Sequence, residues 1–137
     1  MKMATVAPAL QPTGSPAQRL ATVRETLAAA AAAGGHPPPV LVAVSKTFKQ
    51  HAIRPLIEAG QRAFGENRVQ EAMAKWPELM AGTPGIELHL VGQLQSNKAA
   101  DAVRLFHAIH SLDRPSLVAA LGKACTAQGR QPTLFVQ

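Results

Sequence analysis

The sequence has few of the residues that build disulfide scaffolds, aromatic surfaces or membrane spans. A single cysteine, Cys125, excludes an internal disulfide and argues against a small secreted scaffold. Tyrosine is absent and aromatic residues make up 4% of the chain, which leaves few surfaces for stacking nucleic-acid bases. No run of about 18 apolar residues could span a membrane, and the first residues lack the apolar core of a secretory signal. These absences predict a cytoplasmic protein without a membrane segment.

The residues that are present suit one folded domain with a basic surface. The 137 residues, 47% of them apolar and 16% charged, are enough for a single hydrophobic core. The formal net charge of +6 favours anionic partners such as phosphate esters or nucleic acid. The basic residues are scattered without a dense tract, so the net charge is the only feature that supports nucleic-acid binding. We therefore predict no nucleic-acid partner.

The N-terminal part predicts a loose arm and one helix. Residues 1–14 contain proline and glycine without periodicity, which indicates a flexible N-terminal arm. Ser15 followed by Pro16 is typical of a helix start, and an alanine-rich run extends the helix until Gly34 ends it.

The rest of the chain predicts strands that alternate with helices. The first strand, VLVAV, is apolar on both faces, which is typical of a central strand covered by helices on each side. Pro55 requires the helix that follows either to begin near Arg54 or to kink. Strands are predicted at 40–44, 62–66, 86–92, 107–112 and 133–137. Helices are predicted at 49–60, from 69 to near Pro77, at 97–105 and at 113–129.

This order predicts an α/β fold with five parallel strands joined by right-handed crossovers. An open doubly wound sheet and part of a (β/α)8 barrel both fit the pattern. Periodicity alone leaves the two architectures open.

Several familiar chemistries are not supported by the residues. The stretch GQLQSNK has the spacing of a phosphate loop, but Asn97 replaces its second glycine and Ala99 its hydroxyl residue. Ser45 with Lys46, or Ser96 with Lys98, could form a hydrolase dyad, but no oxyanion-hole motif accompanies either pair. The five histidines are not at metal-ligand spacing with Cys, Asp or Glu. We predict no catalytic and no metal-binding residue.

Polar residues do gather at the ends of the predicted strands. Lys46, Glu66–Asn67 and Gly92–Gln93 each follow a strand, at the edge where parallel α/β folds place their sites. A lysine buried there would lose its proton more readily and could form a Schiff base with an aldehyde. A lysine that reaches solvent is the alternative, and spacing alone favours it.

Three motifs resemble a known family. AVSKT at 43–47, FGENRVQEA at 64–72 and HLVGQLQSNK at 89–98 closely resemble signature segments of the pyridoxal 5′-phosphate (PLP) homeostasis proteins of the YggS/PROSC type. HSLDR at 110–114 and the final LFVQ resemble the next two segments in the same order. The resemblance covers residues from about 40 to 137.

The resemblance implies a fold and a site. Residues 15–137 would form a truncated PLP-binding (β/α)8 TIM barrel of fold type III, similar to the N-terminal domain of alanine racemase. Lys46 would carry PLP as a Schiff base, and Asn67 would lie beside the cofactor ring. The third-strand motif would shape the pocket through four further residues: His89, Gly92, Ser96 and Asn97.

The resemblance also implies a function. The protein would be a non-catalytic PLP carrier that serves PLP-dependent apoenzymes in cofactor homeostasis. The alternative is an alanine-racemase-like enzyme acting on amino acids, which needs a second acid/base, commonly a tyrosine, and this chain has none.

The family's late phosphate-gripping loops and the arginine facing the pyridine nitrogen have no counterpart in the 137 residues. The chain therefore resembles an N-terminal fragment, with weaker PLP binding expected. Unpaired sheet edges would favour self-association.

Overall fold

The computed structural model describes residues 13–137, which divide into two compact units at the Pro39–Val40 junction. The first unit contains α1 (Pro16–Ala33), and most of the predicted arm at 1–14 lies outside the described residues. Ser15 forms the predicted cap: its Oγ accepts a hydrogen bond from the Gln18 amide at 3.2 Å, and its own amide donates to Gln18 Oε1 at 2.8 Å. This reciprocal pair satisfies two backbone donors at the helix start.

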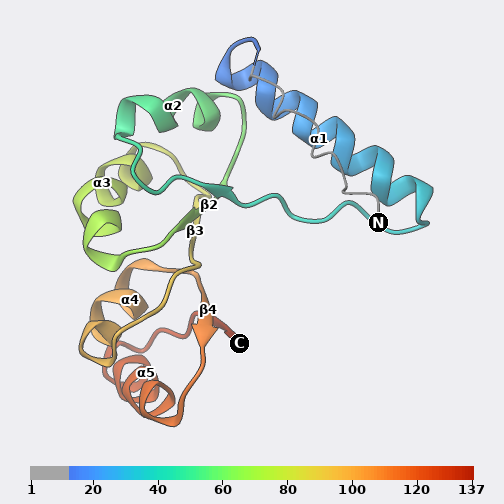
Figure 1. The fold of residues 1–137 in the computed structure, drawn as a ribbon. Helices are drawn as coiled ribbons and strands as arrows, with labels where there is room; N and C mark the ends of the chain where they lie inside the picture. The colour runs from blue at the N-terminus through green and yellow to red at the C-terminus, as the bar shows by residue number, and fades with distance from the viewer. Residues whose placement is uncertain (1–12) are drawn as a thin grey trace, which may run out of the picture. The chain divides into compact units, whose positions relative to one another are not determined.

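The second unit is a five-stranded parallel sheet with the strands in chain order. The strands are β1 (Ala43–Val44), β2 (Ala63–Glu66), β3 (Glu87–Leu90), β4 (Ala108–Leu112) and β5 (Thr133–Val136). Between them lie α2 (Gln50–Glu58), α3 (Val69–Gly82), the 3-10 turn η1 (Ser96–Lys98), α4 (Ala99–Leu105) and α5 (Pro115–Gln128). The predicted sequence of strands and helices is confirmed (Figure 1).

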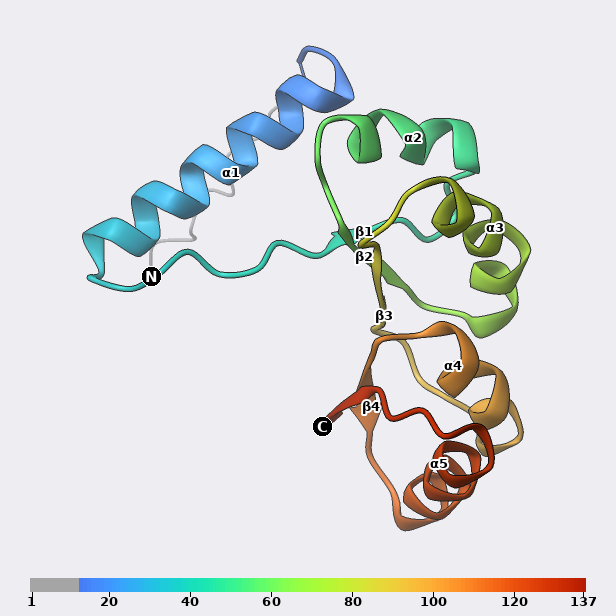
Figure 2. The same ribbon diagram turned by 180° about the vertical axis from the view of Figure 1, so that it is seen from behind.

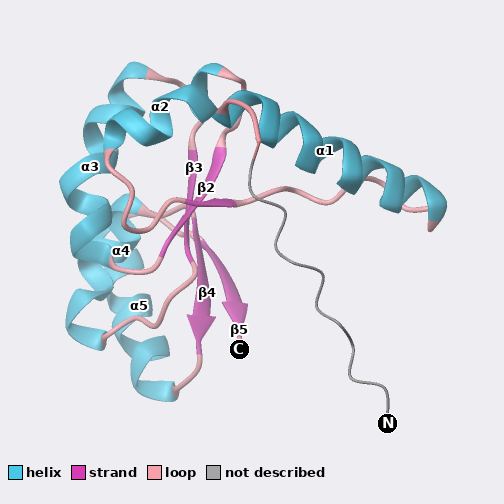
Figure 3. Cartoon of the chain, turned by 45° about the horizontal axis from the view of Figure 1, so that its top comes forward, coloured by secondary structure: helices cyan, strands magenta, loops and turns pink. Residues whose placement is uncertain are grey.

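Within residues 40–137, all of α2 to α5 lie on one side of the sheet, as views from the front, from behind and from above show (Figures 1, 2 and 3). The core forms between these helices and the inward side chains of the strands, with Phe64, Leu88, Leu90 and Ile109 fully buried. The rings of Phe64 and Trp76 pack with centroids 4.9 Å apart and join β2 to α3.

The opposite side of the sheet, here called the open face, carries Val44, Gly65, His89, His110 and Phe135. No helix of residues 40–137 covers it, and Val44 is 50% exposed. The prediction that the first strand is central and covered on both faces is therefore wrong. Only Ala43 and Val44 pair in the ladder, and β1 is an edge strand.

Two helices continue through prolines that were predicted to lie at or near a helix end. α3 continues through Pro77 to Gly82, so its predicted end was too early. Proline has no amide hydrogen, so Pro77 leaves the carbonyl of Met73, four residues earlier, without its helical hydrogen bond. Both residues are exposed, so water can bond that carbonyl. The buried side chains of Trp76 and Leu79 hold the helix against the core on either side of Pro77. α2 likewise begins at Gln50 and includes Pro55 in its interior.

None of the helices within residues 13–137 is long and apolar enough to cross a membrane. That part of the chain also has no group of three or more side chains placed to bind a metal ion.

Candidate functional site

The carboxyl ends of β1, β2 and β3 meet at one edge of the sheet, and the loops that follow them carry Lys46, Asn67 and Gly92. Backbone hydrogen bonds extend the pairing beyond the strands: the Ser45 amide donates to Gly65 O at 2.8 Å, and the Val91 amide donates to Glu66 O at 2.9 Å. The predicted convergence of these loops at one edge is thus present in the structure.

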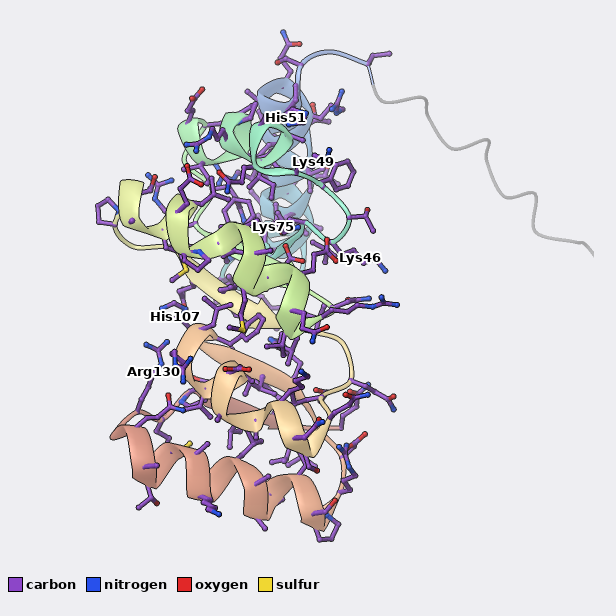
Figure 4. All side chains as sticks on the ribbon, turned by 90° about the vertical axis from the view of Figure 1, so that its left-hand side faces the viewer. Lys46, Lys49, His51, Lys75, His107 and Arg130 are labelled. Atoms are coloured by element: carbon purple, nitrogen blue, oxygen red, sulfur yellow. The ribbon has the colours of Figure 1, made fainter. Side chains whose placement is uncertain are left out.

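Lys46 is exposed, so the interpretation of a buried amine does not hold and the solvent-reaching lysine that spacing favoured is present. The lysine follows an edge strand. Figure 4 shows Lys46 at the outside of the molecule, while Lys75 lies within α3. The solvent-reaching alternative describes this chain, and the amine is open to an aldehyde from solution.

The loop that carries Lys46 is a tight turn over residues 45–48, here called the lysine turn. The Phe48 amide donates to Ser45 O at 3.2 Å and closes the turn around Lys46 and Thr47. Thr47 has φ +67°, in the left-handed region. A β-branched residue rarely adopts this region, at a cost on the order of 1–3 kcal/mol, and keeps it only where its surroundings impose it.

A buried ammonium group contacts both ends of the lysine turn. Lys75 Nζ donates to Ser45 O and Phe48 O, at 2.8 Å each, and so holds both ends of the turn. It also lies 2.8 Å from Glu66 Oε1 and 3.2 Å from Glu71 Oε1. The side chains of Lys75 and Glu66 are 8% and 0% exposed, so both charges are removed from water and depend on each other.

The two carboxylates also hold the turn directly. Glu66 Oε1 accepts from Ser45 Oγ at 2.7 Å and from Trp76 Nε1 at 2.8 Å. Glu71 Oε1 accepts from the amide of the strained Thr47. Burial acts to raise the pKa of Glu71, but the Thr47 amide and the neighbouring Lys75 outweigh it and lower that pKa.

This cluster was not identified from the sequence, because α3 was predicted only as a helix and its charged residues were given no role. A signal was available. Lys75 lies three residues after Ala72 and four before Leu79, on the buried stripe itself, and Glu71 precedes it by one helical turn.

A cleft of about 510 Å³ lies between the loop after β2 and the loop after β3. Its lining includes the predicted residues Asn67 and Gly92 together with the basic side chains of Arg68 and Lys98. A Cβ on Gly92 would stand 2.3 Å from Asn67 O, so only glycine lets the two backbones approach this closely. The cleft brings together two of the six predicted site residues.

The other predicted residues lie near this cleft or away from it, and none of them lines it. Ser96 is half-buried and Asn97 exposed, both in η1. His89 lies on the open face, where its Nδ1 is 2.9 Å from Nε2 of His110, a partner that the sequence did not predict. Burial and the neighbouring His110 lower the pKa of His89. The ring of His110 in turn stacks on Phe135 at 4.6 Å.

These features define a class of protein: a parallel α/β fold of the partial-barrel type, with a lysine held on a rigid turn at the carboxyl edge of its strands. No protein-family model matches the sequence. Solved structures of PipY from Synechococcus elongatus, which is 46% identical, do match. Without PLP, PipY gives a TM-score of 0.76 over 88% of this chain and 52% of PipY, and with PLP bound 0.75 over 86% and 51%.

Curated relatives agree. The pyridoxal phosphate homeostasis protein of Escherichia coli K12 is 44% identical over 103 residues, 72% of this chain and 43% of that protein. That of Mycobacterium tuberculosis H37Rv is 38% identical over 111 residues, 71% of this chain and 43% of that protein. Over these residues the chain is similar to the pyridoxal phosphate homeostasis proteins. It spans less than half the length of these curated relatives.

Proposed function

We propose that this chain binds PLP through Lys46 and serves as a non-catalytic carrier of the cofactor. The lysine turn carries the proposal: it presents an exposed primary amine at the strand edge, fixed at both ends by buried contacts. PipY, with 46% identity, has been solved with PLP bound. Condensation of the Lys46 amine with the PLP aldehyde would form a Schiff base and release one water.

The residues at this edge fit the cofactor in part. The amine is accessible, and Asn67 and Gly92 line a cleft at the same edge into which Arg68 and Lys98 bring positive charge for a phosphate. Exposure leaves the amine without the dry surroundings that favour its neutral form. We therefore expect PLP to bind weakly to this chain.

A carrier role is favoured over catalysis of amino-acid chemistry. The relatives are named for homeostasis, and the 137 residues contain no tyrosine to act as the second acid/base of a racemase. Racemisation of alanine by the purified chain would contradict this choice. As a carrier in the cytoplasm, the chain would pass PLP to PLP-dependent apoenzymes, and reactivation of such an apoenzyme by the PLP-loaded chain tests that step.

The sheet also offers a surface for self-association. β1 and β5 are the edges of the described sheet, and their outer backbone groups are unpaired within it. We propose that copies of the chain associate through these edges. Sedimentation velocity at rising concentration would show larger species, and a constant monomer would contradict the proposal.

Replacing Lys46 tests the binding proposal. PLP should give wild-type protein an imine absorption band and, after borohydride reduction, an adduct that peptide mass spectrometry places on Lys46. Lys46→Ala should lose both, while stability changes by no more than about 0.5 kcal/mol, because the side chain is exposed.

Lys49→Ala is the matched control, since Lys49 is a second exposed lysine just beyond the turn (Figure 4). This variant should keep the band and the adduct. An adduct that persists in Lys46→Ala, or a wild type without any adduct, would contradict the proposed role of Lys46.

A further inference from the structure

We infer that Lys75 is a positioning residue for Lys46: acting with Glu66 and Glu71, it sets the lysine turn in the conformation that presents the Lys46 amine to the cofactor. The inference rests on the proposed function and adds residues to which neither the sequence motifs nor the comparisons assign a role. Lys75 does not contact Lys46 itself, and acts through the backbone on either side.

The first argument is how the contacts converge. Lys75 Nζ has three protons and four oxygens within 3.2 Å, two of them the carbonyls of Ser45 and Phe48 at the ends of the turn. The other two oxygens belong to the carboxylates, and each of these carboxylates also binds a residue of the turn. The polar groups of the turn that contact this cluster are therefore bound to the Lys75 ammonium, either directly or through Glu66 and Glu71.

The second argument is the strained residue within the turn. Thr47 keeps φ +67° because its amide is held by Glu71 Oε1, and Lys75 in turn holds Glu71. Without the ammonium, the buried Glu66 carboxylate would lose its ion-pair partner and Glu71 its nearest cation. The turn would then be free to leave the left-handed conformation at Thr47, and Lys46 would move with it.

The third argument is that stability alone does not call for this cluster. Buried ion pairs can often be replaced by apolar side chains of similar volume with little loss of stability. A methionine at position 75 would fill the space of the lysine stem within α3, although on its own it also leaves the Glu66 carboxylate buried without its cation and so lowers stability. What methionine cannot do is donate to the two carbonyls of the turn.

Lys75→Met tests the inference, with two readouts. The first needs no cofactor: hydrogen exchange of the Thr47 and Phe48 amides, which are bonded to Glu71 and Ser45, should speed up about tenfold or more. The second is the initial rate of borohydride-trapped PLP adduct at Lys46, which should fall about tenfold or more relative to labelling of Lys49, as expected for a displaced reacting group.

Trp76→Phe is the matched control. Trp76 is the next residue of α3, is buried, and donates to the same Glu66 oxygen, but its indole makes no hydrogen bond to the lysine turn. This variant should lower stability while both readouts stay within about twofold of wild type. A role of Lys75 limited to stability would make Lys75→Met behave in the same way, and that result would overturn the inference.

The outcomes separate the inference from the proposed function. If wild type forms no adduct at Lys46, the proposed function fails, and the exchange measurement still decides whether Lys75 orders the turn. If wild type forms the adduct and Lys75→Met matches it in both readouts, only the positioning role fails. Should Lys75→Met not fold, Glu71→Ala, at a half-buried position, is measured in its place. It should speed exchange at Thr47 and slow the labelling of Lys46, and unchanged values would again overturn the inference.

Discussion

At the scale of the residue, Gly92 is where the two loops of the cleft come closest. A methyl group there would stand 2.3 Å from Asn67 O and 2.9 Å from Asn67 Cα, and both of these are backbone atoms that cannot rotate away. We expect Gly92→Ala to lower the free energy of unfolding by about 1–3 kcal/mol, as overpacking does, and to displace Asn67. Urea unfolding measures the loss.

Gly122→Ala is the control for that change. Gly122 is also a glycine without positive φ, but it lies inside α5 and a methyl group there would meet nothing within 4 Å. Alanine should raise stability by about 0.5–1 kcal/mol through helix propensity. Equal effects of the two substitutions would show that the approach of Gly92 to Asn67 is not a tight contact.

The same residues show what sequence could predict about the site. Lys46, Asn67 and Gly92 each follow a strand, and parallel pairing alone brings them to one edge. Spacing also favoured a Lys46 that reaches solvent, but the edge position of β1, beside which Lys46 lies, is set by the pairing of the strands and was not predicted. Lys75 was missed because it lies 29 residues after Lys46, and only the folded chain brings its ammonium to the carbonyls of Ser45 and Phe48.

At the scale of the element, α3 is a helix held together by packing across a proline. Pro77 removes one hydrogen bond in an exposed interior position, which costs about 3 kcal/mol relative to alanine, while its rigid ring returns up to about 1 kcal/mol through the unfolded state. We expect Pro77→Ala to raise the free energy of unfolding by about 1–2 kcal/mol in urea titrations.

Pro115→Ala provides the comparison, because Pro115 is the first residue of α5, where proline has no hydrogen bond to lose. It should give no gain in stability. A Pro77→Ala variant less stable than wild type would mean that the ring at position 77 is itself needed for packing.

Local signals predicted where most elements lie, and tertiary packing decided their ends. The Ser15–Pro16 start and the Gly129 stop were readable because caps act through neighbouring residues. The end of α3 was not, because Trp76 and Leu79, on either side of Pro77, are held in the buried core of the folded chain. Parallel α/β topology followed from the alternation of elements, whereas the choice of a partial barrel over an open sheet came from the resemblance of the motifs to a known family, and the match to PipY agrees with it.

At the scale of the whole molecule, stability should depend on pH through groups whose pKa is lowered by folding. Burial lowers the pKa of His89 and of His107, and neighbouring positive charge on His110 and Arg130 respectively adds to the effect. His107 Nδ1 also accepts a hydrogen bond from the Leu88 amide at 3.0 Å, which only a ring unprotonated at that nitrogen can do. Folding therefore favours the neutral form of both rings.

The sign of the pH effect follows from this. Below about pH 6.5 the unfolded chain binds protons that the folded chain refuses, so stability is full above that pH and falls as the pH drops toward the lowered values. The lowered pKa of Glu71 gives a second window, in which stability is full above about pH 4.3 and is lost below it. Urea midpoints at steps from pH 7.5 to pH 3.5 should show both declines.

His107→Asn assigns the first decline. The asparagine oxygen can take the place of Nδ1 as acceptor for the Leu88 amide but does not titrate, so the slope between neutral pH and pH 5 should become shallower while stability above pH 7 changes little. His51→Asn, at an exposed position on α2, should leave the slope as it is (Figure 4). A wild-type midpoint that stays level or rises as the pH falls from 7.5 to 5 would contradict the assignment of half-buried neutral rings to His89 in β3 and to His107, the residue before β4.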